Sequence, residues 1–464
     1  MSVPDSKTVL AALWRHAGFD DAALRDVHLT GAEPVLPSSF AVGTAAQATI
    51  AAAALAAAEI WRLRTGRRQS VAVDMRRAAI EFRSERYLCV DGQAVDDLHD
   101  DVGGLYRCGD GRWARLHTNL QHHRDGLFKL LGCSHDKAAV QRALDNWQAE
   151  ALETAAAEAG VVVTACRSFA EWDRHPQGRA VAKLPLLSIE KIGDAPPQKL
   201  PPAERPFAGV RVLDLTRIIA GPVCGRTLAV HGADVLLITA KHLASIQSLA
   251  IDTGRGKLSA SVDLRDASGR ETVAALLRDA DIFVQGYRPG AIAAHGFSPQ
   301  EAARIRPGII YVSLCAYGQE GPWAQRRGFD SLVQTASGLN DAEAQAFGSR
   351  VPKALPAQVL DHGTGYLLAF AAMAALKRRM AEGGSWHVRL SLAQTGFWFR
   401  QLGRIDGLAC HDPGFGEVSD RLEETASGFG RLTVVRHAAD MSETPPCWVR
   451  PSVPLATHAA VWPN

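Results

Sequence analysis

The eight cysteines of this 464-residue sequence include no C-x-x-C pair and lie far apart along the chain. This spacing disfavours both a zinc site and a disulfide framework. Scattered single cysteines are typical of reduced thiols in a cytosol, so we expect a cytoplasmic protein.

An excess of charge of one sign is also missing. The chain has 51 basic and 49 acidic residues, a formal net charge of +2. Such a balance gives no general attraction to nucleic acid or to an anionic membrane surface. We therefore expect neither partner, and any site for an anion must be local.

No secretory signal is expected, because the start MSVPDSKTVLAALWRHAGFDD has no basic segment followed by an apolar core. The most apolar early run, residues 45–61, is interrupted by Gln47, Thr49 and Glu59 and is short for a membrane span. It predicts a packed helix instead.

From Gly209 onward, segments typical of strands and helices alternate. Strands are expected at residues 210–215, 233–239, 258–264, 281–286 and 308–318, and helices at residues 221–232, 268–280 and 298–305. This alternation predicts an open, doubly wound parallel sheet of the α/β class. The first strand-to-helix turn, DLTRIIAGP, lacks the G-x-G-x-x-G of a dinucleotide site, which disfavours a nicotinamide or flavin cofactor.

Composition divides the chain into four parts. Residues 194–206 (DAPPQKLPPAERP) read as a proline-rich linker between an N-terminal part, 1–193, and the sheet domain, 207–400. The N-terminal part contains GLYRCGDGRWARLHTNL, which predicts strands around an Asp-Gly turn, and so a smaller α+β domain. Residues 401–464 lack periodicity, and we expect an irregular tail packed on the domains.

A weak repeat relates residues 42–82 to residues 362–399. Both run Gly-Thr, apolar helix, basic and glycine-containing turn, short strand and second helix. Aligning Gly43 with Gly363 places Ala41 opposite Asp361, so the first copy has the scaffold without the acid. Asp361 itself precedes a helix, where it can cap the backbone or serve as a nucleophile, and position alone leaves both open.

Six blocks in the same order resemble the class III CoA-transferases, the family that includes formyl-CoA transferase, carnitine CoA-transferase and α-methylacyl-CoA racemase. They are GVRVLDLTRIIAGPVCGRTLAVHGADVLLI, LSASVDLRDASGR, DADIFVQGYRPGAIAAHGFSP, GIIYVSLCAYGQEGPW, GFDSLVQTASGL and LDHGTGYLLAFAAMAAL. The resemblance implies an open α/β sheet domain joined to a smaller domain, commonly in interlocked dimers.

The same resemblance implies that Asp361 attacks an acyl-CoA thioester, giving a mixed anhydride and then an aspartyl-CoA thioester. Gly363 and Gly365 would let the thioester approach and would leave backbone N–H groups free for oxyanion charge. The substrates would be an acyl-CoA and a carboxylic acid, with no cofactor beyond CoA. The implied contacts with CoA are Ala220, Lys241, Val262, Arg265, Tyr287, Arg288 and Tyr317.

Four positions depart from the family pattern, and one of them, Phe329, favours transfer over racemisation. Phe329 stands where racemases have a histidine, so a two-base proton exchange would lack one base. Ile219 stands where formyl-CoA transferase has a glutamine, Thr239 where an acid is common and Cys315 where a transferase lysine can lie. A racemase or isomerase and a non-catalytic CoA-binding protein remain as alternatives.

Two further expectations concern assembly and metal. The acid-lacking copy suggests an internal pseudo-dimer with one complete site, or else a homodimer. His117, His122 and His123 have no carboxylate or cysteine at ligand spacing, so no metal site is expected.

Overall fold

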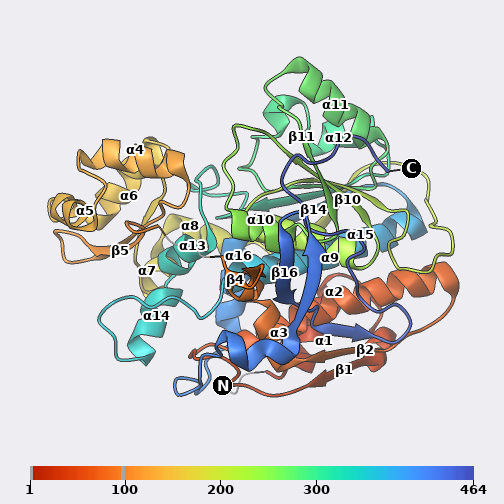
Figure 1. Ribbon diagram of the computed structural model, residues 1–464, viewed down its shortest axis with the longest axis horizontal. Helices are drawn as coiled ribbons and strands as arrows, with labels where there is room; N and C mark the ends of the chain where they lie inside the picture. Colours follow the sequence, from red (N-terminus) through yellow and green to blue (C-terminus); the bar gives the residue numbers. More distant parts are fainter. Residues whose placement is uncertain (1–3, 96–99, 464) are drawn as a thin grey trace.

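A seven-stranded sheet forms the centre of the protein in a computed structural model that describes residues 4–95 and 100–463 (Figure 1). The strand order is β11-β10-β9-β12-β13-β14-β8, with β8 antiparallel at the edge and the others parallel. The strands are β8 (Ser188–Gly193), β9 (Arg211–Leu215), β10 (Asp234–Thr239), β11 (Lys257–Ser261), β12 (Ile282–Gln285), β13 (Ile310–Cys315) and β14 (Ser385–Ser391). The predicted open parallel α/β sheet is confirmed.

Helices cover both faces of this sheet. Successive strand residues point to opposite faces, so Val212 packs in one core with α9 and α15, whereas Leu213 packs in another with α11 and α12. These helices are α9 (Ala220–Val230), α11 (Ala267–Arg278), α12 (Pro299–Ile305) and α15 (Val359–Glu382). Burial on both faces explains why the strands are apolar without alternation.

The long helices α2 (Val42–Thr65) and α15 pack against each other in the centre of the larger core. By length and composition both are apolar enough to cross a membrane, but their most apolar windows are entirely buried inside the protein. Residues 45–61 therefore lie within a packed core helix.

The structure changes the alignment of the two repeated segments. Each consists of a 24-residue helix, a strand and a second helix, namely α2, β2 (Val71–Asp74) and α3 (Met75–Glu81) against α15, β14 and α16 (Leu392–Gln401). The glycines after the first helices, Gly66 and Gly383, and the residues capping the second helices, Asp74 and Ser391, both correspond at an offset of 317 residues. In this register Thr44, not Ala41, corresponds to Asp361, because the helices match along their whole length.

A smaller domain with a separate core lies at the left of Figure 1, in orange and yellow. Its three-stranded sheet is covered by three helices, and Tyr106, Leu127 and Leu152 are among the residues of its core. The elements are β5 (Gly104–Arg107), β6 (Trp113–Leu116), α4 (Gln121–Leu131), α5 (Lys137–Leu144), α6 (Ala149–Glu158) and β7 (Val163–Ala165).

Two further sheets join segments that are far apart in the chain. The tail strands β15 (Leu422–Ser427) and β16 (Gly430–Val435) extend β3 (Cys89–Val90) and β4 (Gln93–Ala94), while β17 (Ala439–Met441) pairs with β2, which also pairs with β1 (Val27–Thr30). The expectation of an irregular tail is thus wrong for these residues, because their strand partners lie in the N-terminal part. Residues 194–203 form no helix or strand.

The remaining helices surround these layers. They are α1 (Ser6–His16), α7 (Phe169–Arg174), α8 (Pro176–Val181), α10 (Gln247–Thr253), α13 (Asp330–Ala336) and α14 (Leu339–Ala346).

Candidate active site

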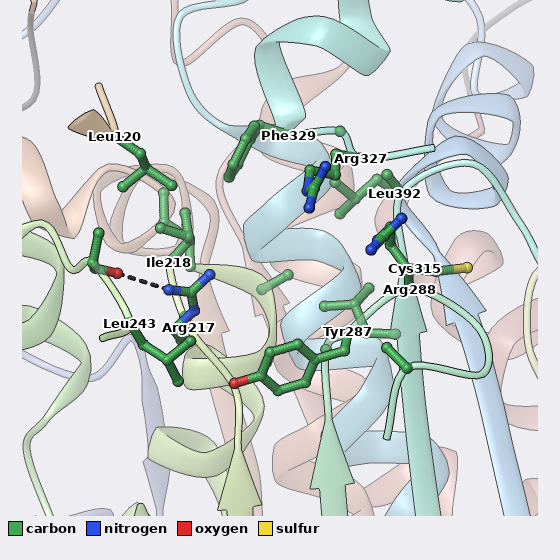
Figure 2. Close-up of a pocket in the computed structure, with 18 of the residues that line it drawn as sticks. Leu120, Arg217, Ile218, Leu243, Tyr287, Arg288, Cys315, Arg327, Phe329 and Leu392 are labelled. Carbon is green, nitrogen blue, oxygen red and sulfur yellow. Dashed lines mark hydrogen bonds between the residues drawn. The ribbon is translucent and has the colours of Figure 1, made fainter. Parts of the chain in front are cut away.

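A cavity of about 450 Å³ lies in the large sheet between β9 and β12, where the order of strand addition reverses from one side of β9 to the other (Figure 2). The carboxyl ends of parallel strands meet there, which is where open α/β sheets bind ligands. Loops after β9, β12 and β13 line the cavity together with Phe329 and Asp361. The smaller domain adds Leu120, His122 and His123. Sheet domain and smaller domain thus both contribute to one site.

Asp361 lies in the first turn of α15 and is 6% exposed. The turn is held by Asp330, whose carboxylate oxygen Oδ2 accepts hydrogen bonds from the backbone N–H groups of Leu360 at 2.8 Å and Asp361 at 2.9 Å. Asp330 thus caps the helix, so the side chain of Asp361 is left to face the cavity.

Three buried carboxyl groups influence one another here. Burial, and then repulsion from Asp330 and Glu85, raises the pKa of Asp361 well above its ordinary value. Burial also raises the pKa of Asp330 to about 6, although hydrogen bonds from the Asp361 backbone and the Gln334 side chain oppose it. Burial acts to raise the pKa of Glu85 as well, but the bond with His362, whose Nε2 lies 3.0 Å from Glu85 Oε2, holds that pKa below its ordinary value.

Arginine side chains give the rest of the cavity a positive charge. Figure 2 shows the guanidinium groups of Arg217, Arg288 and Arg327 around the cavity with the Tyr287 ring beside them. Each donates to a backbone carbonyl oxygen, and none forms an ion pair within residues 4–95 and 100–463. Asp361 is the single carboxyl group among the described lining residues, so the cavity suits an anionic ligand.

The loop from β9 into the cavity is fixed by a buried ion pair. Lys257 Nζ lies 2.9 Å from Asp214 Oδ2 and 2.8 Å from the carbonyl oxygen of Pro222. The other oxygen of Asp214 accepts the backbone N–H of Thr216 at 3.0 Å. Two residues later Ile218 has a φ of 74°, which is strained for a β-branched residue.

The residues that the family resemblance assigns to CoA are distributed over neighbouring cavities. Ala220, Tyr287 and Arg288 line the main cavity. Val262 and Arg265 line an adjoining cavity of about 110 Å³, of which Tyr287 is also part. The two cavities share Tyr287 and Leu243 among their lining residues, so they adjoin at the strand ends, and we call them together the groove.

Two assigned residues lie outside that groove. Lys241 is exposed in the turn after β10 and belongs to neither lining. Tyr317 is 3% exposed and lines a separate cavity of about 320 Å³ beside the arginines. For Lys241 and Tyr317 the structure therefore gives no place in the groove.

The expected role of Gly363 and Gly365 is wrong. Both lie inside α15, so their N–H groups are used by the helix, and neither lines the cavity. A Cβ at Gly365 would lie 2.6 Å from Val223 Cβ and 2.7 Å from the Ala220 carbonyl oxygen. Gly365 is therefore required by the close packing of α15 on α9.

Several residues of the cavity escaped the sequence analysis as site residues. Leu120 and His123 come from the smaller domain, and Arg217 and Arg327 from loops of the sheet domain. Arg327 directly precedes the block GFDSL, and this adjacency was the one feature of the sequence that could have identified it as a site residue. The described residues contain no group of three or more histidine, cysteine or acidic side chains that could hold a metal ion.

The cysteine in the lining is not suited to nucleophilic attack. Burial raises the pKa of Cys315 to about 12, so its thiol stays protonated at neutral pH. Among the described lining residues, Asp361 is the one carboxyl group, which makes it the candidate nucleophile.

Part of the sequence is similar to known CoA-transferases. Residues 207–408 match the model of CoA-transferase family III. An acyl-CoA transferase of Gibberella moniliformis is 30% identical over 318 residues, covering 62% of this chain and 54% of that protein. A succinate–glutarate CoA-transferase of Agrobacterium fabrum is 30% identical over 213 residues, covering 42% of this chain and 52% of that protein.

Among solved structures, Rv3272 from M. tuberculosis is similar with 30% identity and a TM-score of 0.39, covering 43% of this chain and 59% of that one. The chain spans about half the length of the curated relatives that it matches. Residues 207–408 of this chain thus resemble CoA-transferase family III.

Proposed function

We propose that this protein is an acyl-CoA:carboxylate CoA-transferase in which Asp361 is the nucleophile. The observation that carries the proposal is the position of Asp361 as the single carboxyl group among the described lining residues of a cavity. Three arginines of that lining form no ion pair with any described residue. The match of residues 207–408 to the model of CoA-transferase family III supports the same chemistry.

In the proposed reaction, a carboxylate oxygen of Asp361 bonds to the thioester carbonyl carbon. The C–S bond then breaks with its electron pair on sulfur, giving an aspartyl mixed anhydride and CoA thiolate. The thiolate attacks the aspartyl carbonyl and releases the first acid, and a second carboxylate takes CoA by the reverse steps. Covalent catalysis suits this exchange because water must not intercept the acyl group.

The groove accounts for the binding of CoA in this proposal. Guanidinium groups that lack carboxylate partners suit the phosphates, and Arg217, Arg288 and Arg327 are such groups. The Tyr287 ring borders both cavities and offers a face for the adenine.

We also propose that residues 42–82 are an acid-lacking copy of residues 359–399, so that one chain has one complete site. The two segments have matching helix lengths and caps, and Thr44 stands in the place of Asp361. The N-terminal part serves the site through Glu85, which contacts His362. Titration with an acyl-CoA should label one aspartate per chain, and two labelled aspartates would contradict the copy.

The test of the main proposal is acyl-aspartate trapping. The protein is incubated with a panel of acyl-CoAs, treated with hydroxylamine, and digested for mass spectrometry. Asp361 should carry the hydroxamate, and Asp361→Asn should lose both the label and CoA transfer while still binding CoA. The matched control Asp279→Asn, at an exposed position after α11, should keep both.

Two other outcomes would favour the alternative functions. Exchange of the substrate α-proton in D2O without an acceptor acid would indicate a racemase or isomerase. Binding of CoA with no label at Asp361 under any acyl-CoA would indicate a non-catalytic protein.

A further inference from the structure

At the start of α15, the backbone N–H groups of residues 360–362 are already bonded within the protein. The N–H groups of Leu360 and Asp361 donate to Asp330, and that of His362 donates to the Gln358 carbonyl oxygen at 3.0 Å. From Gly363 onward the N–H groups belong to the helix. Attack on a thioester places negative charge on its carbonyl oxygen, and that charge needs a donor. The bonded N–H groups of α15 do not supply it, so a side chain of the cavity is a candidate donor.

His123 has the properties of such a donor. It lies in the first turn of α4 in the smaller domain, lines the same cavity as Asp361, and is 2% exposed. Neither Nδ1 nor Nε2 of its ring has a hydrogen-bond partner in the part of the chain that the structure describes. A buried polar group without a partner costs stability, so its retention indicates a ligand.

The packing around His123 places it near the nucleophile. The rings of His123 and Phe329 form an edge-on contact with a centroid distance of 5.8 Å. The ring of His117 stacks on Phe329 with a centroid distance of 4.0 Å. Phe329 is followed by Asp330, whose carboxylate holds the backbone of Asp361. One dipeptide thus connects the histidine and the aspartate.

The environment also keeps His123 neutral. Burial, followed by the positive charges of His122, His117, Arg327 and Arg217, lowers its pKa to about 3. A neutral imidazole carries one N–H donor and one acceptor. A neutral N–H donor forms a stronger hydrogen bond with an oxyanion than with an uncharged carbonyl oxygen. It therefore stabilises the transition state more than the bound substrate, which accelerates the reaction.

We propose that His123 donates a hydrogen bond to the thioester carbonyl oxygen of the acyl-CoA that Asp361 attacks, an inference that rests on the proposed function. As the Asp361 oxygen bonds to the carbonyl carbon, the C=O π electrons move to the oxygen, where the His123 N–H meets them. When the C=O bond re-forms, the C–S bond breaks and its electron pair leaves on the CoA sulfur. The histidine proton stays on the ring throughout.

The experiment compares His123→Phe, which removes the donor, with His123→Gln, which keeps an N–H. We expect His123→Phe to lower kcat about 100-fold, as loss of one oxyanion donor does elsewhere. CoA affinity should hold and urea stability should be equal or higher, because an unpaired polar group has been removed. His123→Gln should recover part of kcat. His135→Gln, at an exposed position in the same domain, is the control and should match wild type.

Wild-type transfer that Asp361→Asn abolishes is measured first, and its absence would refute the proposed function rather than the role of His123. Given that transfer, wild-type kcat in His123→Phe would overturn the role. A loss of kcat accompanied by an equal loss of CoA affinity or stability would also overturn it. So would a shift of the acid limb of the pH profile in His123→Gln, because such a shift indicates that His123 transfers a proton. If the Phe variant does not fold, His123→Met, which also lacks a donor, replaces it.

Discussion

Alanine at Gly363 and at Gly365 should change the stability of the protein in opposite directions. Both glycines lie in the interior of α15, where alanine gains about 1 kcal/mol over glycine. A Cβ at Gly363 would meet Thr395 Cγ2 at 3.4 Å, an ordinary contact, so Gly363→Ala should stabilise by up to about 1 kcal/mol.

At Gly365 the new methyl group would overlap with Val223 Cβ at 2.6 Å and the Ala220 carbonyl oxygen at 2.7 Å. Neither atom can rotate away, so α9 and α15 must separate, at a cost near the upper end of the 1–3 kcal/mol typical of overpacking. Set against the gain in helix propensity, Gly365→Ala should destabilise by about 2 kcal/mol. Ala220 lines the cavity, so activity should fall as well.

Urea unfolding followed by circular dichroism measures both variants, with CoA transfer as a second assay. The two free energies of unfolding should differ by about 3 kcal/mol. If Gly363→Ala abolished transfer while leaving the protein folded, position 363 would contact substrate, and the packing argument would be refuted.

Three further predictions concern the pH dependence of rate, the pH dependence of stability, and the buried ion pair. Because burial and neighbouring carboxylates raise the pKa of Asp361, and because the ionised form attacks, initial rates should rise with pH through a midpoint well above the ordinary aspartate value of about 3.9. The pKa of Asp330 is raised to about 6, so the folded state binds this proton more tightly than the unfolded state. The free energy of unfolding in urea should therefore decrease as the pH rises from about 4 to about 6. Lys257→Met should cost about 3–5 kcal/mol by leaving Asp214 buried and unpaired, and Asp214→Asn in the same chain should recover part of it. A pH–rate profile with its midpoint at the ordinary aspartate pKa would contradict the argument for Asp361. An unchanged free energy of unfolding in Lys257→Met would contradict the argument for the ion pair.

Local sequence pattern was sufficient for the sheet domain. Parallel strands buried on both faces must be apolar, and the helices between them must be amphipathic or buried, so the alternation shows in the chain itself. The predicted helix 221–232 and strand 233–239 correspond to α9 and β10 within a few residues. The tail strand β17 could not be found in this way, because its partner β2 lies about 370 residues earlier.

The sequence alone determined that Asp361 stands at the start of a buried helix, behind family blocks in a fixed order. Only the tertiary structure decided what that carboxyl group meets. Burial, and then repulsion from Asp330 and Glu85, raises its pKa, and His123 lines the same cavity from another domain. These residues are 31, 276 and 238 positions from Asp361 in the sequence, and no local pattern can report a contact that folding alone brings about.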